Sequence, residues 1–465
     1  IEQLTSELGW LPHTTRAAIS LARDLIAGSA EAFEPKRDEP APDALAGLAA
    51  LLPRQDTAAS RRALIFNPAC FPRRIGVELP RWEHAPAIDP VVVAGGTSGE
   101  RTFAVVDVPA VGFVWIEPAQ ASQANAREKP LAAENTLGNE FFEAKISRAT
   151  GGIQSLYNYS QRGNQLSQQI AFRTSGSGEA AYTAMRATSV EVTASCPAYG
   201  EITSTGALVD AAGRQMATFR QTTGVWAGSR VIQVTMELSD VEEPRPDPWN
   251  SYYAARFAWP DENIQLWRGV SLARQKTQAG RIEAPEFIDL DNGAGTLSIL
   301  TGGLPYHRRS DPRMLDSLLV VRGETARRFE MGIGVDLSHP AAAALELITP
   351  SALYDETAPP ATRSSGWFFH SGAKNVVATH WQPLLGEAPP DPATAKRPIR
   401  GFKARLLEIA GNPGRVPLHA FRRVATARQV DFLGETILEL FVDDDKIMLD
   451  FGAHEFLEVE AVWDK

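Results

Sequence analysis

The densest group of side chains that could do chemistry in this sequence lies in the run TGGLPYHRRSD. It places an aromatic ring, an imidazole and two guanidinium groups next to one another, at Tyr306, His307, Arg308 and Arg309. The glycines and the proline predict a loop after an apolar strand, where binding groups tend to lie. A tyrosine ring can stack on a sugar face, and an arginine can donate paired hydrogen bonds to hydroxyls or a carboxylate. We predict a substrate-binding surface at these four residues; the alternative is that the two arginines form surface ion pairs.

Carboxylates are concentrated in the run EAPEFIDLD, at Glu283, Glu286, Asp289 and Asp291. Glycoside hydrolysis generally uses two carboxylates that face one sugar. Their abundance alone identifies no pair, and the simpler interpretation is a strand end followed by a solvated acidic loop. We therefore assign no catalytic residue in this chain.

Aromatic side chains are concentrated in the run PDPWNSYYAARFAWP, which contains Trp249, Tyr252, Tyr253, Phe257 and Trp259. Alternation along a strand places Tyr252 and Tyr253 on opposite faces of a sheet, so at least one face is expected to belong to the core. The alternative is a platform on which carbohydrate stacks.

Motifs for metal and nucleotide chemistry are absent from the sequence. No two of the eight histidines lie within five residues of each other, and HxH, HxD and HExxH do not occur. GxGxxG, GxxxxGK[ST] and GxSxG are also missing. Cys70 and Cys196 have no CxxC or Cys/His spacing, which predicts isolated buried thiols. We predict no metal site and no cofactor in this chain.

Composition indicates a folded protein of several domains. The 465 residues include 44% hydrophobic and 22% charged residues, and the net charge is −10. This charge argues against nucleic acid as a partner, because phosphate binding depends on clustered lysine and arginine. No run is long and apolar enough to predict a membrane span. The sequence begins at Ile1 without a signal-like layout, so we expect a processed or excised start and leave the compartment open.

The elements that must position these residues are mostly short strands. Runs such as ALIFNP, FAVVDVPAVGFVWIEP and VIQVTMELSD combine β-branched and aromatic residues with turn signals at their ends. The fold class is therefore mainly β. The expected units are a helical segment and linker (1–60), a small β domain (61–118), a large β supersandwich (134–350) and a C-terminal β-sandwich (360–465).

A family resemblance follows from the run ENTLGNEFFEAKISRATGGIQSLYNYSQRGNQL. It resembles the opening of the large β-sandwich that follows the catalytic domain in glycoside hydrolase family 38 α-mannosidases. Further runs resemble later parts in family order: ALIFNPACFPRRIGVELP, VVDVPAVGFVWIEP, GGLPYHRRSDPRMLDSLLVVRGE, and RLLEIAGNPGRVPL with KIMLDFGAHEFLEVEAVW. The residues that match in the first run are Asn139, Phe141, Phe142, Thr150, Gly151, Gly152, Ile153, Ser155 and Leu156.

The resemblance implies a galactose-mutarotase-like supersandwich and a role in retaining hydrolysis of α-mannosides. Family members hold a zinc ion with an H-x-D motif, and use an aspartate nucleophile, in an upstream α/β domain. We identify neither the H-x-D motif nor an aspartate nucleophile in this sequence. We therefore expect this chain to be the non-catalytic C-terminal region, with zinc in the absent domain. In some members an arginine of the large sandwich reaches the sugar, which makes Arg308 and Arg309 candidates by resemblance.

The expected partners are a mannose-containing glycan and the chain's own upstream catalytic domain, with homo-oligomerisation possible and neither nucleic acid nor membrane involved. The alternative is a free-standing carbohydrate-binding module or a structural β module that mediates assembly.

Overall fold

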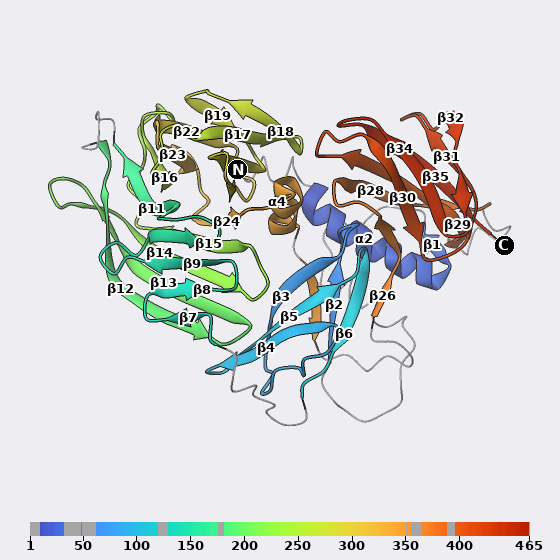
Figure 1. Cartoon of the computed structure of the whole chain (residues 1–465), viewed down its shortest axis with the longest axis horizontal. Helices are drawn as coiled ribbons and strands as arrows, with labels where there is room; N and C mark the ends of the chain where they lie inside the picture. Colours follow the sequence, from blue (N-terminus) through green and yellow to red (C-terminus); the bar gives the residue numbers. More distant parts are fainter. Residues whose placement is uncertain are drawn as a thin grey trace.

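The computed structural model shows three β-rich units and two helices, α2 (Trp10–Ala27) and α4 (Pro340–Ile348), within its described residues. In Figure 1 the large sandwich lies to the left, the small β unit below the centre and the C-terminal sandwich to the right. The mainly β fold class is confirmed. The described residues are 10–31, 48, 62–119, 129–174, 181–349, 351–355, 365–387 and 396–464.

The large sandwich consists of two nine-stranded sheets that enclose one apolar core. Sheet I has the order β19-β22-β23-β16-β11-β10-β9-β8-β7, and sheet II has the order β12-β13-β14-β15-β24-β21-β20-β17-β18. Strand β9 shows why the sheets pack: its side chains alternate between buried and exposed, as expected for a strand with one face on a core. This is the supersandwich expected from the sequence.

The strands of sheet I are β7 (Ala132–Ala133), β8 (Thr136–Gly138), β9 (Phe142–Ile146), β10 (Ile153–Asn158), β11 (Leu166–Arg173), β16 (Tyr252–Ala258), β19 (Arg281–Glu283), β22 (Tyr306–Asp311) and β23 (Met314–Val320). Those of sheet II are β12 (Ala184–Ser195), β13 (Tyr199–Val209), β14 (Gln215–Trp226), β15 (Val231–Ser239), β17 (Gln265–Val270), β18 (Ala273–Thr277), β20 (Phe287–Asp291), β21 (Thr296–Leu300) and β24 (Arg328–Val335).

The turn between β9 and β10 depends on its two glycines. Gly151 has a φ of +82°, a left-handed conformation that glycine adopts without a steric penalty. Gly152 lies against the backbone of β11, and a Cβ atom there would come within 2.3 Å of the Gln168 carbonyl oxygen. The first glycine of the TGG run is therefore required by its left-handed backbone, and the second by its close contact with the backbone of β11.

The small β unit combines a three-stranded sheet, β3-β5-β4, with a four-stranded sheet, β25-β2-β6-β26. Two of its strands, β25 and β26, follow the large sandwich in the chain, so sheet membership crosses the domain boundaries expected from the sequence. Its strands are β2 (Ala63–Asn67), β3 (Arg73–Leu79), β4 (Val92–Ser98), β5 (Arg101–Val108), β6 (Gly112–Ile116), β25 (Ala352–Asp355) and β26 (Ser365–Trp367).

The C-terminal sandwich pairs a six-stranded sheet, β1-β29-β35-β31-β32 with β28 beside β29, with a four-stranded sheet, β27-β30-β34-β33. The buried face of α2 joins the same apolar cluster as this sandwich. Most of the rest of the predicted helical segment and linker lies outside the described residues. The strands are β1 (Ser29–Glu31), β27 (Phe369–Ser371), β28 (Val376–Leu385), β29 (Lys396–Glu408), β30 (Gly414–Ala420), β31 (Val424–Val430), β32 (Thr436–Glu439), β33 (Val442–Asp443), β34 (Lys446–Phe451) and β35 (Phe456–Trp463).

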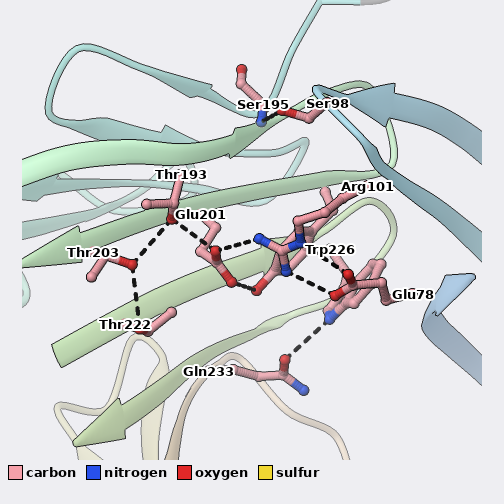
Figure 2. A network of polar contacts seen from close by, with 11 residues as sticks. Glu78, Ser98, Arg101, Thr193, Ser195, Glu201, Thr203, Thr222, Trp226 and Gln233 are labelled. Carbon is pink, nitrogen blue, oxygen red and sulfur yellow. Dashed lines mark hydrogen bonds and ion pairs between the residues drawn. The ribbon is translucent and has the colours of Figure 1, made fainter. Parts of the chain in front are cut away.

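A polar network joins the small unit to sheet II (Figure 2). The Arg101 guanidinium donates to both carboxylate oxygens of Glu78, at 3.0 and 2.8 Å, and to Glu201 Oε1 at 2.8 Å. Glu201 also accepts from Thr193 at 2.7 Å and from the Tyr199 hydroxyl at 2.9 Å. Burial opposes ionisation of Glu201, but these donors outweigh it and lower its pKa. Arg101 is thus shared between carboxylates of two units.

No helix within the described ranges has the length and apolar character needed to cross a lipid bilayer.

Candidate functional site

The four residues predicted as a binding surface lie on strand β22 and not on a loop. Because side chains alternate along a strand, Tyr306 and Arg308 lie on one face of sheet I and His307 on the other. His307 and Arg309 pair with Ser317 and Leu315 of β23. The structure therefore brings Tyr306 and Arg308 together and separates them from His307.

His307 faces the core of the large sandwich and has no exposed surface (0%). Its Nε2 lies 3.1 Å from the Ala284 carbonyl oxygen and 3.0 Å from that of Leu304, and its Nδ1 lies 2.9 Å from Ser317 Oγ. Since carbonyls only accept, Nε2 carries the proton and Nδ1 accepts from the serine. Burial lowers the pKa of His307 to about 4, although the two carbonyls oppose that shift. This histidine is a neutral, satisfied group of the core.

On the outer face, Tyr306 and Trp249 form an aromatic pair at the edge of sheet I. Tyr306 is 44% exposed, and its ring meets Trp249 edge-to-face at 6.2 Å and 76°. The Arg281 guanidinium lies 5.0 Å from the centre of the Trp249 ring, within cation–π range. The pair thus presents one exposed aromatic ring that is held by a second, half-buried one.

Arg308 is anchored to the same place through one of its nitrogens. Its Nη1 donates to the Trp249 carbonyl oxygen and, at 3.3 Å, to Asn250 Oδ1. In the described part of the chain, its other N–H groups have no protein acceptor, and the side chain is half-buried. Arg308 therefore keeps donors available beside the Tyr306 ring.

The segment that carries Trp249 is shaped by Asp247. Its carboxylate accepts from the Trp249 amide at 3.0 Å and from Asn250 Nδ2 at 2.6 Å, which closes a local turn. The Asn250 hydrogen bond, the Trp249 amide and the nearby charges of Arg281 and Arg308 lower the pKa of Asp247. The turn sets the position of the tryptophan ring over β22.

A buried carboxylate, Asp316, lies behind this surface on β23 with 0% exposure. It accepts from the Tyr182 hydroxyl at 2.6 Å, the Tyr252 hydroxyl at 2.7 Å and Arg256 Nε at 2.9 Å. Arg308 pairs with Asp316 in register across β22 and β23, and Arg256 pairs with it across β16. Burial and the Asp316 charge raise the pKa of Tyr252, so its hydroxyl stays protonated and donates.

Sequence reasoning missed Tyr182, Arg256 and Asp316. A signal was present, because Asp316 and Arg256 each stand inside an apolar strand, MLDSLLV and YYAARFA. A charge in such a place requires a partner. The partners could not be named, because they come from strands far apart in the chain.

Other predicted groups have structural roles. Arg309 Nη2 donates to the Pro312 carbonyl oxygen at 2.9 Å. Tyr252 and Tyr253 are both buried at 0% exposure, so the interpretation of this aromatic run as core holds for them. Phe257 and Trp259 are buried too, which leaves Trp249 as the half-exposed member of the run.

The acidic run is divided between two strands: exposed Glu283 ends β19, Glu286 lies in the connection, and Asp289 and Asp291 lie on β20 instead of in a solvated loop. Asp289 is fully buried on β20, where it accepts from Arg274 and Ser298, both at 2.7 Å. Burial raises the pKa of Asp289 even though these donors oppose the shift. Asp291 also pairs with Arg274, at 3.4 Å. These contacts describe an ion-paired structural group.

Metal binding was tested on the residues present. Across the part of the chain that the structure describes, no three His, Cys, Asp or Glu side chains come together as ligands. The residues described therefore do not form a zinc site. The arrangement on sheet I is suited to binding, through an exposed ring and free guanidinium donors.

These features define the class of protein: a β-rich chain of several sandwiches with an aromatic and arginine surface on its largest sheet pair. No family model and no curated protein matches the sequence. A protein in the glycosyl hydrolase family 38 from Enterococcus faecalis aligns with 90% of this chain and 60% of its own length, at a TM-score of 0.63 and 11% identity.

A second solved structure, an alpha-mannosidase from Enterococcus faecalis V583, aligns with 91% of this chain and 58% of its own length, at a TM-score of 0.62 and 10% identity. The chain thus shares its fold with about three fifths of each of these proteins. A galactose mutarotase-like protein from Lactobacillus casei aligns with 43% of this chain at a TM-score of 0.27, which is too low to carry an argument.

Proposed function

We propose that this chain is the non-catalytic, β-rich region of an α-mannosidase-type glycoside hydrolase, and that its sheet I surface supports the sugar site. The observation that carries the proposal is the exposed Tyr306 ring, fixed by Trp249 and flanked by the free donors of Arg308. The shared fold with the two Enterococcus faecalis structures adds support.

The chemistry of the surface fits a neutral sugar. An aromatic ring offers its face to the C–H side of a pyranose, while guanidinium N–H groups donate to hydroxyls. Tyr306 and Arg308 supply these two functions next to each other. We leave His307 and Arg309 out of the proposed contacts, since the first is buried and the second lies on the other pleat of β22.

The proposed division of labour leaves bond cleavage to an upstream domain. Retaining hydrolysis needs a nucleophilic carboxylate and an acid on either side of the sugar, and the family resemblance assigns these and zinc to that domain. The residues of this chain would bind and orient the sugar and form part of the wall that excludes water. The proposed partners are accordingly a mannose-containing glycan and the catalytic domain.

A titration of the chain with methyl α-D-mannopyranoside, followed by saturation-transfer NMR, tests the surface. We expect Tyr306→Ala to weaken binding by about tenfold, because loss of a stacked ring costs roughly 1 kcal/mol or more. Tyr157→Ala is the matched control: Tyr157 is 40% exposed on β10 of the same sheet, four strands from β22. Equal loss in both variants would contradict the proposal, as would hydrolysis of an aryl α-mannoside by this chain alone.

One observation favours a second function, assembly. The C-terminal sandwich exposes a group of large apolar side chains around β32. Exposed apolar patches often mark protein contacts. Light scattering that shows a stable oligomer, together with no binding in the sugar titration, would favour this alternative. The exposed residues are Phe432, Leu433, Ile437, Leu438, Phe441 and Phe456.

A further inference from the structure

A cleft of about 370 Å³ opens between the small β unit, sheet II and helix α4. None of the residues of the Tyr306 surface lines it. Its size falls in the range of about 300 to 1,000 Å³ that is usual for small-molecule pockets, which often lie between domains. The cleft is therefore a separate candidate site.

The floor of the cleft is the outer face of sheet II. Gln233 and Thr235 point outward from β15 and line the cleft, while the alternate residue, Val234, is buried. In register, Gln233 lies opposite Gly332 of β24 and Thr235 lies opposite Glu330. Gly332 has no side chain of its own, and the side chains of Val231 and Leu300 pack over it.

The wall at α4 is formed by an arginine and a carboxylate. Arg73 of β3 donates to the carbonyl oxygens of Thr349 and Glu346 at the C-terminal end of α4, both at 3.0 Å. Its side chain is only 8% exposed, and its Nε has no hydrogen-bond partner among the residues that the structure describes. Glu346 Oε1 lies 3.8 Å from this Nε, beyond hydrogen-bond distance.

Several other polar groups at the cleft have unused hydrogen-bonding capacity. Gln233 Oε1 accepts from Trp226 Nε1 at 3.1 Å, which fixes the amide and leaves its NH₂ group as a donor (Figure 2). Among the described residues, neither that NH₂ group nor the Thr235 hydroxyl has a hydrogen-bond partner. The Glu346 side chain is 37% exposed, and its carboxylate accepts no hydrogen bond from this described part of the chain. Hydrogen-bond donors and hydrogen-bond acceptors therefore line the same cleft.

We propose that this cleft binds a single ring of a neutral sugar. A sugar hydroxyl donates and accepts at once, which matches the Glu346 carboxylate, the Gln233 NH₂ group and the Thr235 hydroxyl that line one cavity. A simple anion is disfavoured by Glu330 and Glu346, and a simple cation by Arg73 and Arg74. An apolar ligand would leave buried polar groups unsatisfied.

The cleft is held at a fixed width. Trp226 forms one end, and its ring lies so close to Gly76 of β3 that a Cβ atom there would come within 2.1 Å of it. Arg101 binds carboxylates of the small unit and of sheet II at the same junction (Figure 2). A preorganised site loses less free energy on binding than one that must close.

The test uses the whole chain in a Tyr306→Ala background, so that the sheet I surface contributes as little as possible. Methyl α-D-mannopyranoside and methyl α-D-glucopyranoside are titrated by saturation-transfer NMR, with sodium phosphate and sodium acetate as anion probes followed by protein chemical shifts. We expect at least one sugar to bind, and Gln233→Ala and Glu346→Gln each to weaken it about five- to tenfold, the usual effect of one lost hydrogen bond.

Gln154→Ala is the control, because Gln154 is an exposed glutamine on β10 of the other sheet. Its titration is expected to match the background, with all variants showing an unchanged melting temperature. Sugar binding that is equal in Gln233→Ala, Glu346→Gln and Gln154→Ala would overturn the proposal. So would the absence of binding by both sugars, or binding of phosphate or acetate in their place.

Discussion

At the scale of single residues, the large sandwich contains charged and titratable groups that are fully enclosed by protein. Asp316 and His307 lie on adjacent strands but on opposite faces of sheet I, and both are at 0% exposure. The Asp316 carboxylate accepts hydrogen bonds from four other residues, whereas burial keeps His307 in its neutral form. Both groups are therefore held in place by partners that the fold supplies.

The buried histidine predicts a loss of stability in acid. Its pKa falls from 6.5 to about 4 on folding, so the unfolded chain binds more protons between these values. The stability that the neutral ring gives to the folded state is complete above pH 6.5 and is lost as the pH falls through 4. This loss lowers the free energy of unfolding by up to about 3 kcal/mol. We expect His307→Gln to flatten the dependence of the urea unfolding midpoint on pH in this window.

The control is His84→Gln, since His84 is exposed. It is expected to keep the pH dependence of the unchanged chain. An unaltered slope in His307→Gln would show that other groups cause the acid sensitivity.

At the scale of elements, strand pleating decides which neighbours in the sequence become neighbours in space. The run PYHRRSD looked like a loop because its polar residues are consecutive and follow two glycines and a proline. In the structure it pairs with β23 and β19 inside sheet I, and tertiary pairing overrides the local signal. The proximity of Tyr306 and Arg308 could be predicted from the run, but their separation from His307 needed the strand.

Other parts of the fold could be predicted from the sequence. The mainly β class, the supersandwich and the turn at Gly151 and Gly152 follow from strand runs and turn residues. The Asp316 network did not, because Tyr182 is 134 residues away from Asp316 in the chain. A single sequence contains no direct information on which distant strands pair.

The β9–β10 turn gives a prediction at this scale. We expect Gly152→Ala to destabilise the large sandwich by about 2 kcal/mol, because the new Cβ atom would clash with a backbone carbonyl that cannot rotate away. Gly280→Ala is the control, since no atom lies within 4 Å of a Cβ atom there. Urea unfolding measures both, and equal stability of the two variants would contradict the packing argument.

At the scale of the whole molecule, the units are joined by polar as well as apolar contacts. One apolar cluster includes residues of α2, α4, the small unit and the C-terminal sandwich. The junction between the small unit and sheet II combines a separate apolar cluster, which includes Phe103, Cys196 and Tyr199, with the Arg101 network. The orientation of the small unit therefore depends on apolar packing as well as on directional hydrogen bonds.

Arg101→Ala is expected to loosen this junction. It leaves Glu201, which is 11% exposed, without its charged partner, at a cost of about 2 kcal/mol. Hydrogen exchange in β3 and β5 should become faster than in the unchanged chain, whereas exchange in the C-terminal sandwich should stay the same.

Arg415→Ala is the control, because Arg415 forms an exposed ion pair with Asp450, at 3.6 Å, within the C-terminal sandwich. It is expected to cost less than about 1 kcal/mol and to leave the junction unchanged. Equal exchange in the two variants would argue against a special role for Arg101.

The strand order of the small unit has a consequence for synthesis on the ribosome. Its four-stranded sheet needs β25 and β26, yet β25 begins at Ala352 and β6 ends at Ile116. At about 5 to 20 residues per second, the ribosome needs roughly 10 to 50 seconds to supply the missing strand. During that interval one edge of β2 is without its partner while the whole large sandwich emerges. The nascent chain must therefore protect an unfinished sheet, and the large sandwich can fold first although it begins later.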